Sequence, residues 1–473
     1  MPHVVIIGGG ISGLSSAFAL QEASQKTGRS IACTVLDSQP QWGGKIHTSH
    51  ARGLIIEGGP DSFLSAKPWA LDLCRQLGLH DQLVNTNEEN NQTFSYSRGR
   101  LRAIPQGLIA FIPTRLSSLI FSGILSWPGI LRLGAEWFVR PLPESDHDES
   151  VASFFYRRVG RETFDRLIEP LVAGIYAGDA SELSLKATFP RFHELEQKYG
   201  GLIKGVLAQR STPKPLPTGF KPTMFMTLRG GLGDLIEALT KRVESSGATL
   251  RLGQQVVALQ MTNATANRYK VVLQSGEMLT ADGVVLATPA YVSSMLMRPH
   301  HESLSNLLDQ IPYASTATVS LAYRREDVGG SIRGFGFVIP RKEGKALIAA
   351  TWTSLKWPNR TSSNQILIRC YLGGRGREAI LECDDVALVT YIREELRTII
   401  GMTHAPVYTE VFRWERSMPQ YTCGHLNRLE RIREIQNVFK GLYLTGAAYE
   451  GIGIPDCIRE GTRVGQDLAH SLV

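Results

Sequence analysis

The stretch VVIIGGGISG at residues 4–13 decides how this chain begins to fold. Four apolar residues typical of a strand run directly into the pattern GxGxxG, and small and apolar residues typical of a helix follow. Gly8 allows a tight turn, Gly10 lets a phosphate approach the backbone, and Gly13 lets helix and strand pack closely. We therefore expect a dinucleotide-binding βαβ unit over residues 3–37.

Asp37 follows the second expected strand, at residues 31–36. An acid in this place accepts hydrogen bonds from ribose hydroxyls, while the helix N-terminus binds the pyrophosphate. A glycine turn without a ligand is the alternative, and the strand–turn–helix context makes it the less favoured one. The residues expected to hold the pyrophosphate are Gly8, Gly9, Gly10, Ile11, Ser12 and Gly13.

Composition fits a large globular enzyme. The chain has 473 residues, of which 43% are hydrophobic and 20% charged, so a disordered or fibrous protein is excluded. Six scattered cysteines form no CxxC pair and no metal-spaced cluster, so we expect neither a disulfide framework nor a metal site. Reduced thiols and the lack of a cleavable signal favour the cytoplasm.

Basic charge is concentrated in two stretches. Residues 91–140 hold six arginines against the single acid Glu136, and residues 197–229 hold six basic residues and no acid. Such fields favour a polycarboxylate ligand or an anionic membrane surface, and no nucleic-acid-binding motif accompanies them. The longest uncharged apolar stretch, residues 116–131, has only 16 residues and contains a proline, whereas a span needs about 20. At most peripheral membrane contact is expected.

Longer strings carry a family resemblance. A GGK string at residues 43–45 and GGPDS at residues 58–62 resemble the GG-doublet branch of the glutathione-reductase-type FAD fold. Four strings then resemble the FAD-dependent, oxygen-using protoporphyrinogen and coproporphyrinogen oxidase family, above all its soluble bacterial type, and the likeness covers nearly the whole chain. They are EGGPDSF (57–63), EPLVAGIYAGD (169–179), RWERSMPQY (413–421) and GIGIPDC (451–457).

The resemblance implies a noncovalent FAD. Lys45 stands where this branch commonly has an arginine. The lysine keeps the positive charge but lacks the two-pronged hydrogen bonding of a guanidinium group. Asp37 has a shorter side chain than the glutamate usual at its position. For Val256 and Trp414, a role in core packing alone is the alternative. A covalent bond between Cys457 and the flavin is a less favoured alternative to noncovalent binding. Besides residues 8–13, the implied FAD-binding residues are Asp37, Ser38, Lys45, Gly59, Pro60, Asp61, Ser62, Val256, Trp414, Gly446, Ile452, Gly453 and Ile454.

The substrate cavity is less sharply indicated. Gly174 and Ile175 are expected at one face of a macrocycle, and Lys67 is expected to meet a propionate, although it reads equally well as a solvated cation. Trp352 and Lys356 are two further candidates on the expected substrate sheet.

The resemblance implies a reaction with flavin as hydride acceptor. Coproporphyrinogen III would lose six electrons to give coproporphyrin III in haem biosynthesis, with oxygen consumed and hydrogen peroxide formed. No catalytic side chain is expected, because the cofactor carries the chemistry. Protoporphyrinogen IX is the alternative substrate, and an amine oxidase, a carotenoid desaturase or a flavin-free binding protein of the same fold is a more distant alternative. A haem-pathway chelatase is a candidate partner.

The expected architecture is an α/β, multi-lobe chain. A Rossmann-like FAD-binding domain comprises residues 1–60, 223–298 and 424–473, and a mixed-sheet substrate domain comprises residues 61–90 and 299–423. Residues 91–210 form a helical insert, and residues 211–222 form a proline-rich linker.

Overall fold

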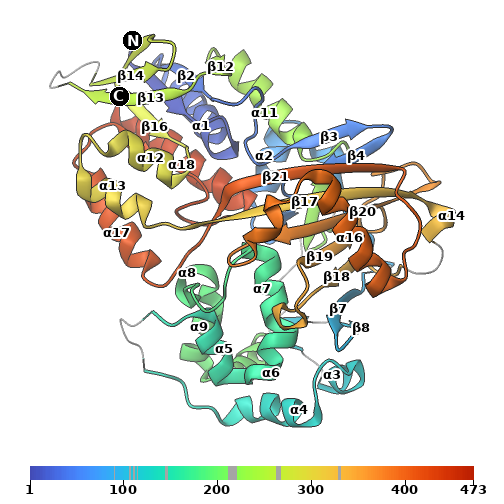
Figure 1. The fold of residues 1–473 in the computed structure, drawn as a ribbon. Coiled ribbons are helices and arrows are strands. Elements are labelled where there is room, and N and C mark those ends of the chain that lie inside the picture. Colours follow the sequence, from blue (N-terminus) through green and yellow to red (C-terminus); the bar gives the residue numbers. More distant parts are fainter. Residues whose placement is uncertain are drawn as a thin grey trace.

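The computed structural model describes residues 1–89, 91–105, 108–109, 112–113, 116–143, 148–210, 221–262, 268–328 and 332–472. Figure 1 shows a sheet-and-helix part that holds both termini, a second sheet beside it, and a group of helices below. Most of the proline-rich linker, residues 211–220, lies outside the described residues.

A parallel sheet forms the first part. Its strand order is β12 (Thr249–Arg251), β2 (Ala32–Leu36), β1 (His3–Ile7), β16 (Gly283–Leu286) and β22 (Leu442–Leu444). Val4 and Ile6 of β1 pack in one core with α1 (Ile11–Thr27), α11 (Gly233–Ser245) and α18 (Ile454–Ser471). Val5 and Ile7 pack on the opposite face, against the meander β13 (Val256–Met261), β14 (Tyr269–Leu273) and β15 (Met278–Ala281). Because both faces are covered, the strands are apolar throughout.

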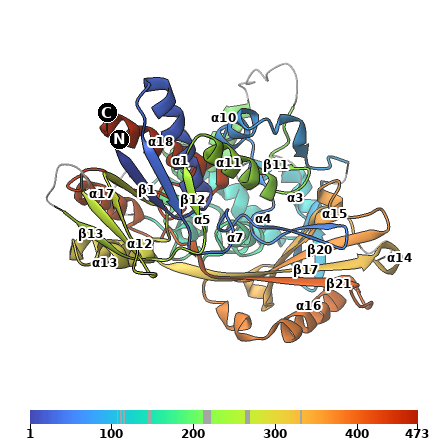
Figure 2. The ribbon, with the colours of Figure 1, turned by 90° about the horizontal axis from the view of Figure 1, so that it is seen from above.

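A seven-stranded mixed sheet forms the second part. Its order is β21 (Tyr408–Pro419), β17 (Tyr313–Arg324), β20 (Gln365–Gly373), β19 (Leu347–Trp352), β18 (Gly336–Val338), β7 (Thr93–Ser97) and β8 (Arg100–Ala103). Among the described strand pairs of this sheet, β18 and β7 are parallel and all others are antiparallel. Helix α16 (Asp385–Ile400) covers one face (Figure 2). The hairpin β3 (Thr48–Ala51) and β4 (Leu54–Glu57) packs on the sheet through Leu54 and Ile56.

Helices dominate the third part. They are α3 (Leu116–Ser122), α4 (Trp127–Gly134), η2 (Ala135–Phe138), α5 (Val151–Val159), α6 (Arg161–Thr163), the π-helical turn η3 (Phe164–Ile168), α7 (Glu169–Tyr176), α8 (Leu185–Thr188), α9 (Pro190–Tyr199) and α10 (Leu202–Arg210). A core of aromatic and aliphatic side chains, among them Phe154, Phe155 and Leu195, joins them. The α/β fold class with a parallel sheet, a mixed sheet and a helical segment is confirmed.

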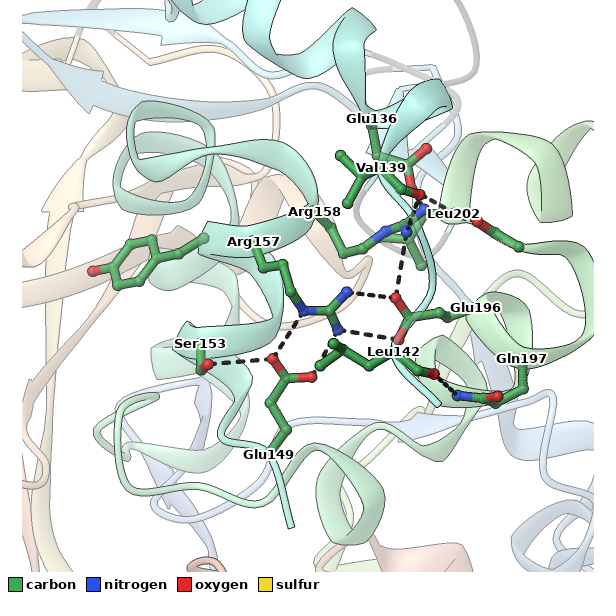
Figure 3. A network of polar contacts seen from close by, with 12 residues as sticks. Glu136, Val139, Leu142, Glu149, Ser153, Arg157, Arg158, Glu196, Gln197 and Leu202 are labelled. Atoms are coloured by element: carbon green, nitrogen blue, oxygen red, sulfur yellow. Dashed lines mark hydrogen bonds and ion pairs between the residues drawn. The ribbon is translucent and has the colours of Figure 1, made fainter. Parts of the chain in front are cut away.

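A buried ionic network ties this helical segment together (Figure 3). Arg158 is fully buried and pairs with Glu136 and with Glu196, the latter at 3.3 Å. Arg157 bridges Glu196 at 2.6 Å and Glu149 at 2.8 Å. Glu136 also accepts the backbone N–H of Leu202 at 2.8 Å, so one carboxylate joins η2 to the start of α10.

Two segments lie in other places than the sequence predicts. Residues 93–103, expected in the helical insert, form β7 and β8 at the edge of the mixed sheet, because β7 finds a partner in β18, far along the chain. Helix α2 (Trp69–Gln76), expected in the substrate domain, packs in the core of α1 and α18. Strands β5 (Phe63–Leu64), β11 (Phe225–Leu228) and β6 (Leu83–Asn85) form a small sheet of their own. The other domain boundaries stay a prediction.

Several elements have no counterpart in the sequence-based prediction. These are α12 (Ala290–Met297), α13 (Glu302–Asp309), α17 (His425–Gln436) and the strands β9 (Leu108–Ile109) and β10 (Ile112–Pro113). Within the described part of the chain, no helix combines the length and apolar character needed to cross a bilayer. The same residues include no group of three or more His, Cys, Asp or Glu side chains placed to hold a metal ion.

Candidate functional site

The glycine turn after β1 leaves no room for side chains. Gly8 has φ +112°, and a Cβ there would lie 2.6 Å from the carbonyl oxygen of Ala287. A Cβ on Gly13 would lie 1.9 Å from the carbonyl oxygen of Gly8. Strand and helix therefore touch through backbone, and the N-cap residue of α1, Gly10, provides no side-chain hydrogen bond to the helix. Its first N–H groups are available to an anion.

Asp37 is anchored beside this turn. One carboxylate oxygen accepts the backbone N–H of Gly9 at 2.6 Å, and the other accepts the N–H of Gln39 at 2.8 Å. Each oxygen of an ionised carboxylate can accept more than one hydrogen bond, so capacity for ribose hydroxyls is left. Ser38 is exposed next to it.

The GG doublet lies directly on the glycine turn. Gly43 and Gly44 have φ +106° and +59°, and the Gly43 N–H donates to the carbonyl oxygen of Gly9 at 2.9 Å. Lys45 follows, and burial lowers the pKa of its ammonium group, an effect that nearby Cys457 opposes. No hydrogen bond or ion pair with another described residue reaches Lys45. A cation without a counterion here would be stabilised by a bound anion.

Helix α18 runs alongside α1. A Cβ on Gly461 would lie 2.3 Å from the carbonyl oxygen of Ser12, and one on Gly465 would lie 2.3 Å from that of Ser16. This register places the start of α18 about 9 Å beyond the start of α1, given a rise of about 1.5 Å per residue. The N-cap residue of α18, Gly453, likewise provides no side-chain hydrogen bond to its helix. The two free N-termini therefore suit an elongated ligand.

The mixed sheet holds the second glycine pair. The carbonyl oxygen of Gly58 accepts Trp414 Nε1 at 2.8 Å, Thr318 Oγ1 at 2.8 Å and Arg369 Nη2 at 3.1 Å. These donors come from β21, β17 and β20. A Cβ on Gly59 would collide with the carbonyl oxygen of Lys45, at 1.7 Å. The turn at residues 58–59 thus joins the GG doublet to the mixed sheet.

Asp61 continues this turn as a buried acceptor. It accepts Lys356 Nζ and Trp357 Nε1, each at 3.1 Å, and Ser62 Oγ at 2.7 Å. Burial would raise the pKa of the Asp61 carboxyl, but Lys356, Arg369 and these hydrogen bonds hold it well below its usual range. Lys356, expected in the substrate cavity, is therefore engaged in an ion pair with a residue expected to bind FAD.

Trp352 lies in the protein core, so its predicted place in the substrate cavity is wrong. It is 1% exposed, packs against Phe337 in the core of the mixed sheet, and donates Nε1 to the carbonyl oxygen of Arg333 at 3.1 Å. A side chain enclosed in this way does not line a substrate cavity. The strand alternation that puts Trp352 on the inner face is not visible in the string around it.

Lys67 reaches the C-terminal string. Its Nζ lies 2.5 Å from Oδ2 of Asp456, whose side chain is 5% exposed. That carboxylate also fills the space beside Gly451, which has φ +125°. Gly174 and Ile175 are exposed on α7, and Val256, the first residue of β13, is buried in the core between the meander and the parallel sheet. Ile452 packs against the helical segment, and Ile454 is buried at the start of α18.

The loop after β22 begins with a buried hydroxyl that has no hydrogen-bond partner among the described residues. Thr445 is 1% exposed, and its hydroxyl makes no hydrogen bond with any described residue. Gly446 follows with φ +131° and with open space where a Cβ would stand. A buried hydroxyl next to such a space is able to form a hydrogen bond with a polar ligand.

Known proteins resemble the chain over nearly its whole length. The family model for flavin containing amine oxidoreductase matches residues 11–469. The chain belongs to this family. Coproporphyrinogen III oxidase of Bacillus subtilis is 36% identical over 97% of this chain and 96% of its own length, and that of Staphylococcus aureus is 33% identical over 99% of each. A solved structure from Exiguobacterium sp. 255-15, assigned to protoporphyrinogen oxidase, has TM-score 0.86 and 30% identity over 99% of each chain.

The residues of this flavin-containing amine oxidoreductase fit a bound flavin cofactor. The glycine turn, the two uncapped helix N-termini and the unpaired Lys45 provide a place for phosphate, and Thr445 provides a free buried hydroxyl. The resemblance to porphyrinogen oxidases is confirmed at the level of the family. The role of each single residue stays a prediction.

Sequence reasoning missed the residues that fix the site from the mixed sheet. Thr318 and Arg369 bind the carbonyl oxygen of Gly58 across 260 and 311 positions of the chain. Trp42 covers Gly9, since a Cβ on Gly9 would lie 2.3 Å from its ring. No pattern of neighbouring residues in the sequence predicts these long-range contacts. The family resemblance links only the strings at residues 57–63 and 413–421, through Gly59 and Trp414.

Proposed function

We propose that this chain is an FAD-dependent coproporphyrinogen III oxidase of haem biosynthesis. The observation that carries the proposal is the cradle of uncapped helix N-termini, unpaired Lys45 and anchored Asp37 in a chain so similar to two coproporphyrinogen III oxidases. An elongated dinucleotide such as FAD suits the offset of the two helices. The product would be a metal-free porphyrin, which makes a haem-pathway chelatase the partner we propose.

The flavin would be held without a covalent bond. Burial raises the pKa of the Cys457 thiol to about 11, so it stays protonated and is a poor nucleophile. Denaturation with acid or urea should release all FAD into the supernatant. Flavin absorbance that stays with the precipitated chain would contradict this.

When bound, the flavin supplies a hydride acceptor at N5. The chain itself has to bind the porphyrinogen, orient one meso carbon and keep water away. We assign the substrate side to Gly174 and Ile175 on α7 and the flavin side to residues 452–454. We propose molecular oxygen as the electron acceptor, with hydrogen peroxide as its product.

Substrate choice follows from charge. Coproporphyrinogen III has four propionates and protoporphyrinogen IX has two, and each charge-assisted contact contributes about 1.5–3 kcal/mol. Lys67 is 42% exposed at the C-terminal string, so it can meet a propionate as well as Asp456. A single additional contact would favour coproporphyrinogen III by about tenfold in kcat/KM.

The test measures initial rates with both porphyrinogens in one buffer, with oxygen as acceptor, at low and high ionic strength. We expect coproporphyrinogen III to be preferred at low salt, and the preference to narrow as salt screens the exposed charges. Equal or reversed preference would assign the chain to protoporphyrinogen IX. A purified protein without flavin colour would revive a flavin-free binding role.

We further propose a cytoplasmic protein with peripheral membrane contact. All six cysteines are free, which suits a reducing compartment. The end of the helical segment exposes Phe121, Trp127, Leu131 and Phe138, at 88, 68, 73 and 83%. Aromatic and aliphatic side chains that project in this way suit the surface of a lipid bilayer.

A further inference from the structure

Two adjacent residues after β21 hold the ends of two distant segments. Gln420 is 1% exposed and Tyr421 is 2% exposed. Gln420 Nε2 donates to the carbonyl oxygen of Tyr176 at 2.9 Å, at the C-terminal end of α7. Gly178 fits against it without a side chain, since a Cβ there would lie 2.4 Å from Gln420 Oε1. Gln420 therefore fixes the end of the helix that exposes Gly174 and Ile175.

Tyr421 fixes the other segment through its hydroxyl. This hydroxyl donates to the carbonyl oxygen of Ala447 at 2.8 Å and accepts the backbone N–H of Gly451 at 2.8 Å. Burial raises the pKa of Tyr421 well above its usual value, so the proton for the first bond is retained. The ring stacks on His425 at 4.1 Å between centroids and 12° between planes, which leaves the hydroxyl little freedom.

Both ends of the loop at residues 447–451 are thus held by one oxygen atom. The loop leads directly into Ile452 and the uncapped N-terminus of α18 at Gly453. Asp456 also occupies the space beside Gly451, and Cys457 Sγ lies 3.8 Å from the carbonyl oxygen of Gly451. A shift of the Tyr421 hydroxyl would therefore move the residues that we assign to the flavin side.

We propose that Gln420 and Tyr421 are positioning residues that hold the substrate-facing end of α7 and the flavin-facing loop at residues 447–454 in register. The inference rests on the proposed function, because it concerns the distance between substrate and flavin. Neither residue needs to touch either molecule. A misplacement of about 1 Å between reacting groups costs on the order of 100-fold in rate.

The test uses Tyr421→Phe, which keeps the ring and its stacking but removes the hydroxyl. The matched control is Tyr269→Phe, because Tyr269 is also buried and donates to one carbonyl oxygen, that of Lys440, at 2.7 Å. In Tyr421→Phe we expect the dissociation constant for FAD to rise about tenfold and the bound flavin spectrum to shift, since Gly451 and Ala447 lose their partner. Tyr269→Phe should lose thermal stability without either change.

Anaerobic reduction of bound flavin by coproporphyrinogen III tests the register itself. Tyr421→Phe should reduce its flavin about 10- to 100-fold more slowly, with KM within about twofold of the wild type. Gln420→Met, which is similar in size but cannot donate to Tyr176, should slow reduction about tenfold and leave the FAD dissociation constant unchanged. This variant decides the case if Tyr421→Phe does not fold.

The proposal is overturned if Tyr421→Phe matches Tyr269→Phe in FAD affinity, flavin spectrum and reduction rate, or if Gln420→Met reduces its flavin at the wild-type rate. Failure of the proposed function looks different. A wild-type protein that binds FAD but oxidises neither porphyrinogen defeats that function, whereas the FAD affinity and spectrum of Tyr421→Phe still decide the role of its hydroxyl.

Discussion

At the scale of single residues, Gly13 is the point where the first helix touches the first strand. Any Cβ there would overlap the carbonyl oxygen of Gly8, at 1.9 Å, so α1 would have to move away from the turn. We expect Gly13→Leu to purify without flavin absorbance and to gain no thermal stability from added FAD. Gly134→Ala is the control, because nothing lies within 4 Å of a Cβ at that position. Full flavin content in Gly13→Leu would refute pyrophosphate binding at this turn.

Lys45 should have opposite effects on the empty and the loaded protein. Its side chain is largely enclosed and has no counterion among the described residues, and this desolvation lowers its pKa and costs folding energy. We therefore expect Lys45→Met to raise the stability of the FAD-free protein by about 1 kcal/mol and to raise the FAD dissociation constant about 10- to 100-fold. Lys45→Arg should keep most of the affinity. Urea unfolding and FAD titration measure the two effects, and equal FAD affinity in Lys45→Met would exclude a phosphate contact.

At the scale of elements, the network around Arg158 joins η2, α5, α9 and α10 (Figure 3). Glu136→Gln leaves a buried guanidinium with less charge compensation and should cost about 3 kcal/mol of unfolding free energy. Hydrogen exchange should rise across these helices. The exposed pair of Glu237 and Lys241, at 2.5 Å, is the control, and Glu237→Gln should leave stability unchanged. If both substitutions lowered the unfolding free energy equally, the buried network would contribute no more to stability than an exposed ion pair.

Helices α3 and α4 lie at the lower edge of the helical segment in Figure 1, and η2 follows α4 directly in the chain. Replacing Phe121, Trp127, Leu131 and Phe138 together by serine should leave folding intact, because these side chains are exposed. Sedimentation with anionic vesicles should fall at least about fivefold, since each buried apolar side chain contributes about 1.5–3 kcal/mol. Serine at Val386 and Val438, two exposed valines elsewhere, is the control. Unchanged sedimentation would show that this end does not meet lipid.

At the scale of the whole molecule, acid should weaken the fold through His425. Burial lowers the pKa of His425 to about 4, assisted by Arg428 and Arg433 and opposed by the carbonyl oxygen of Tyr449. The unfolded chain, with an ordinary histidine near pH 6.5, binds the proton more readily, so this stability is complete above about pH 6.5 and is lost toward pH 4. Between about pH 6.5 and pH 4, the unfolding free energy of His425→Phe, measured with urea, should fall by about 3 kcal/mol less than that of the wild type. The control is His470→Gln at an exposed histidine, and its stability should depend on pH as that of the wild type does. If His425→Phe lost as much stability in acid as the wild type, His425 would not be the cause of the acid sensitivity.

Local patterns were sufficient wherever a function depends on neighbours in the chain. The GxGxxG turn and Asp37 lie within residues 8–37, and the structure brings them together as the strand–turn–helix pattern predicts. The GG doublet, which the family resemblance indicated, lies against the same turn. The reason is that strand pairing of β1 with β2 and the backbone of a glycine turn are set by a short segment. Family strings added the likeness to porphyrinogen oxidases, which whole-length comparison confirmed at the family level.

Tertiary structure decided what depends on distant segments. Residues 93–103 became strands because β18 offers them a partner, and Trp352 became a core residue because α16 and its own sheet enclose it. The three donors to Gly58 and the two bonds of Tyr421 likewise join parts of the chain that no local pattern connects. The sequence by itself thus determined the strand–turn–helix unit with its glycine turn and, through its longer strings, the family. The order of the mixed sheet and the register between α7 and the loop at residues 447–451 required the folded chain, because burial and hydrogen bonding act between residues that only folding brings together.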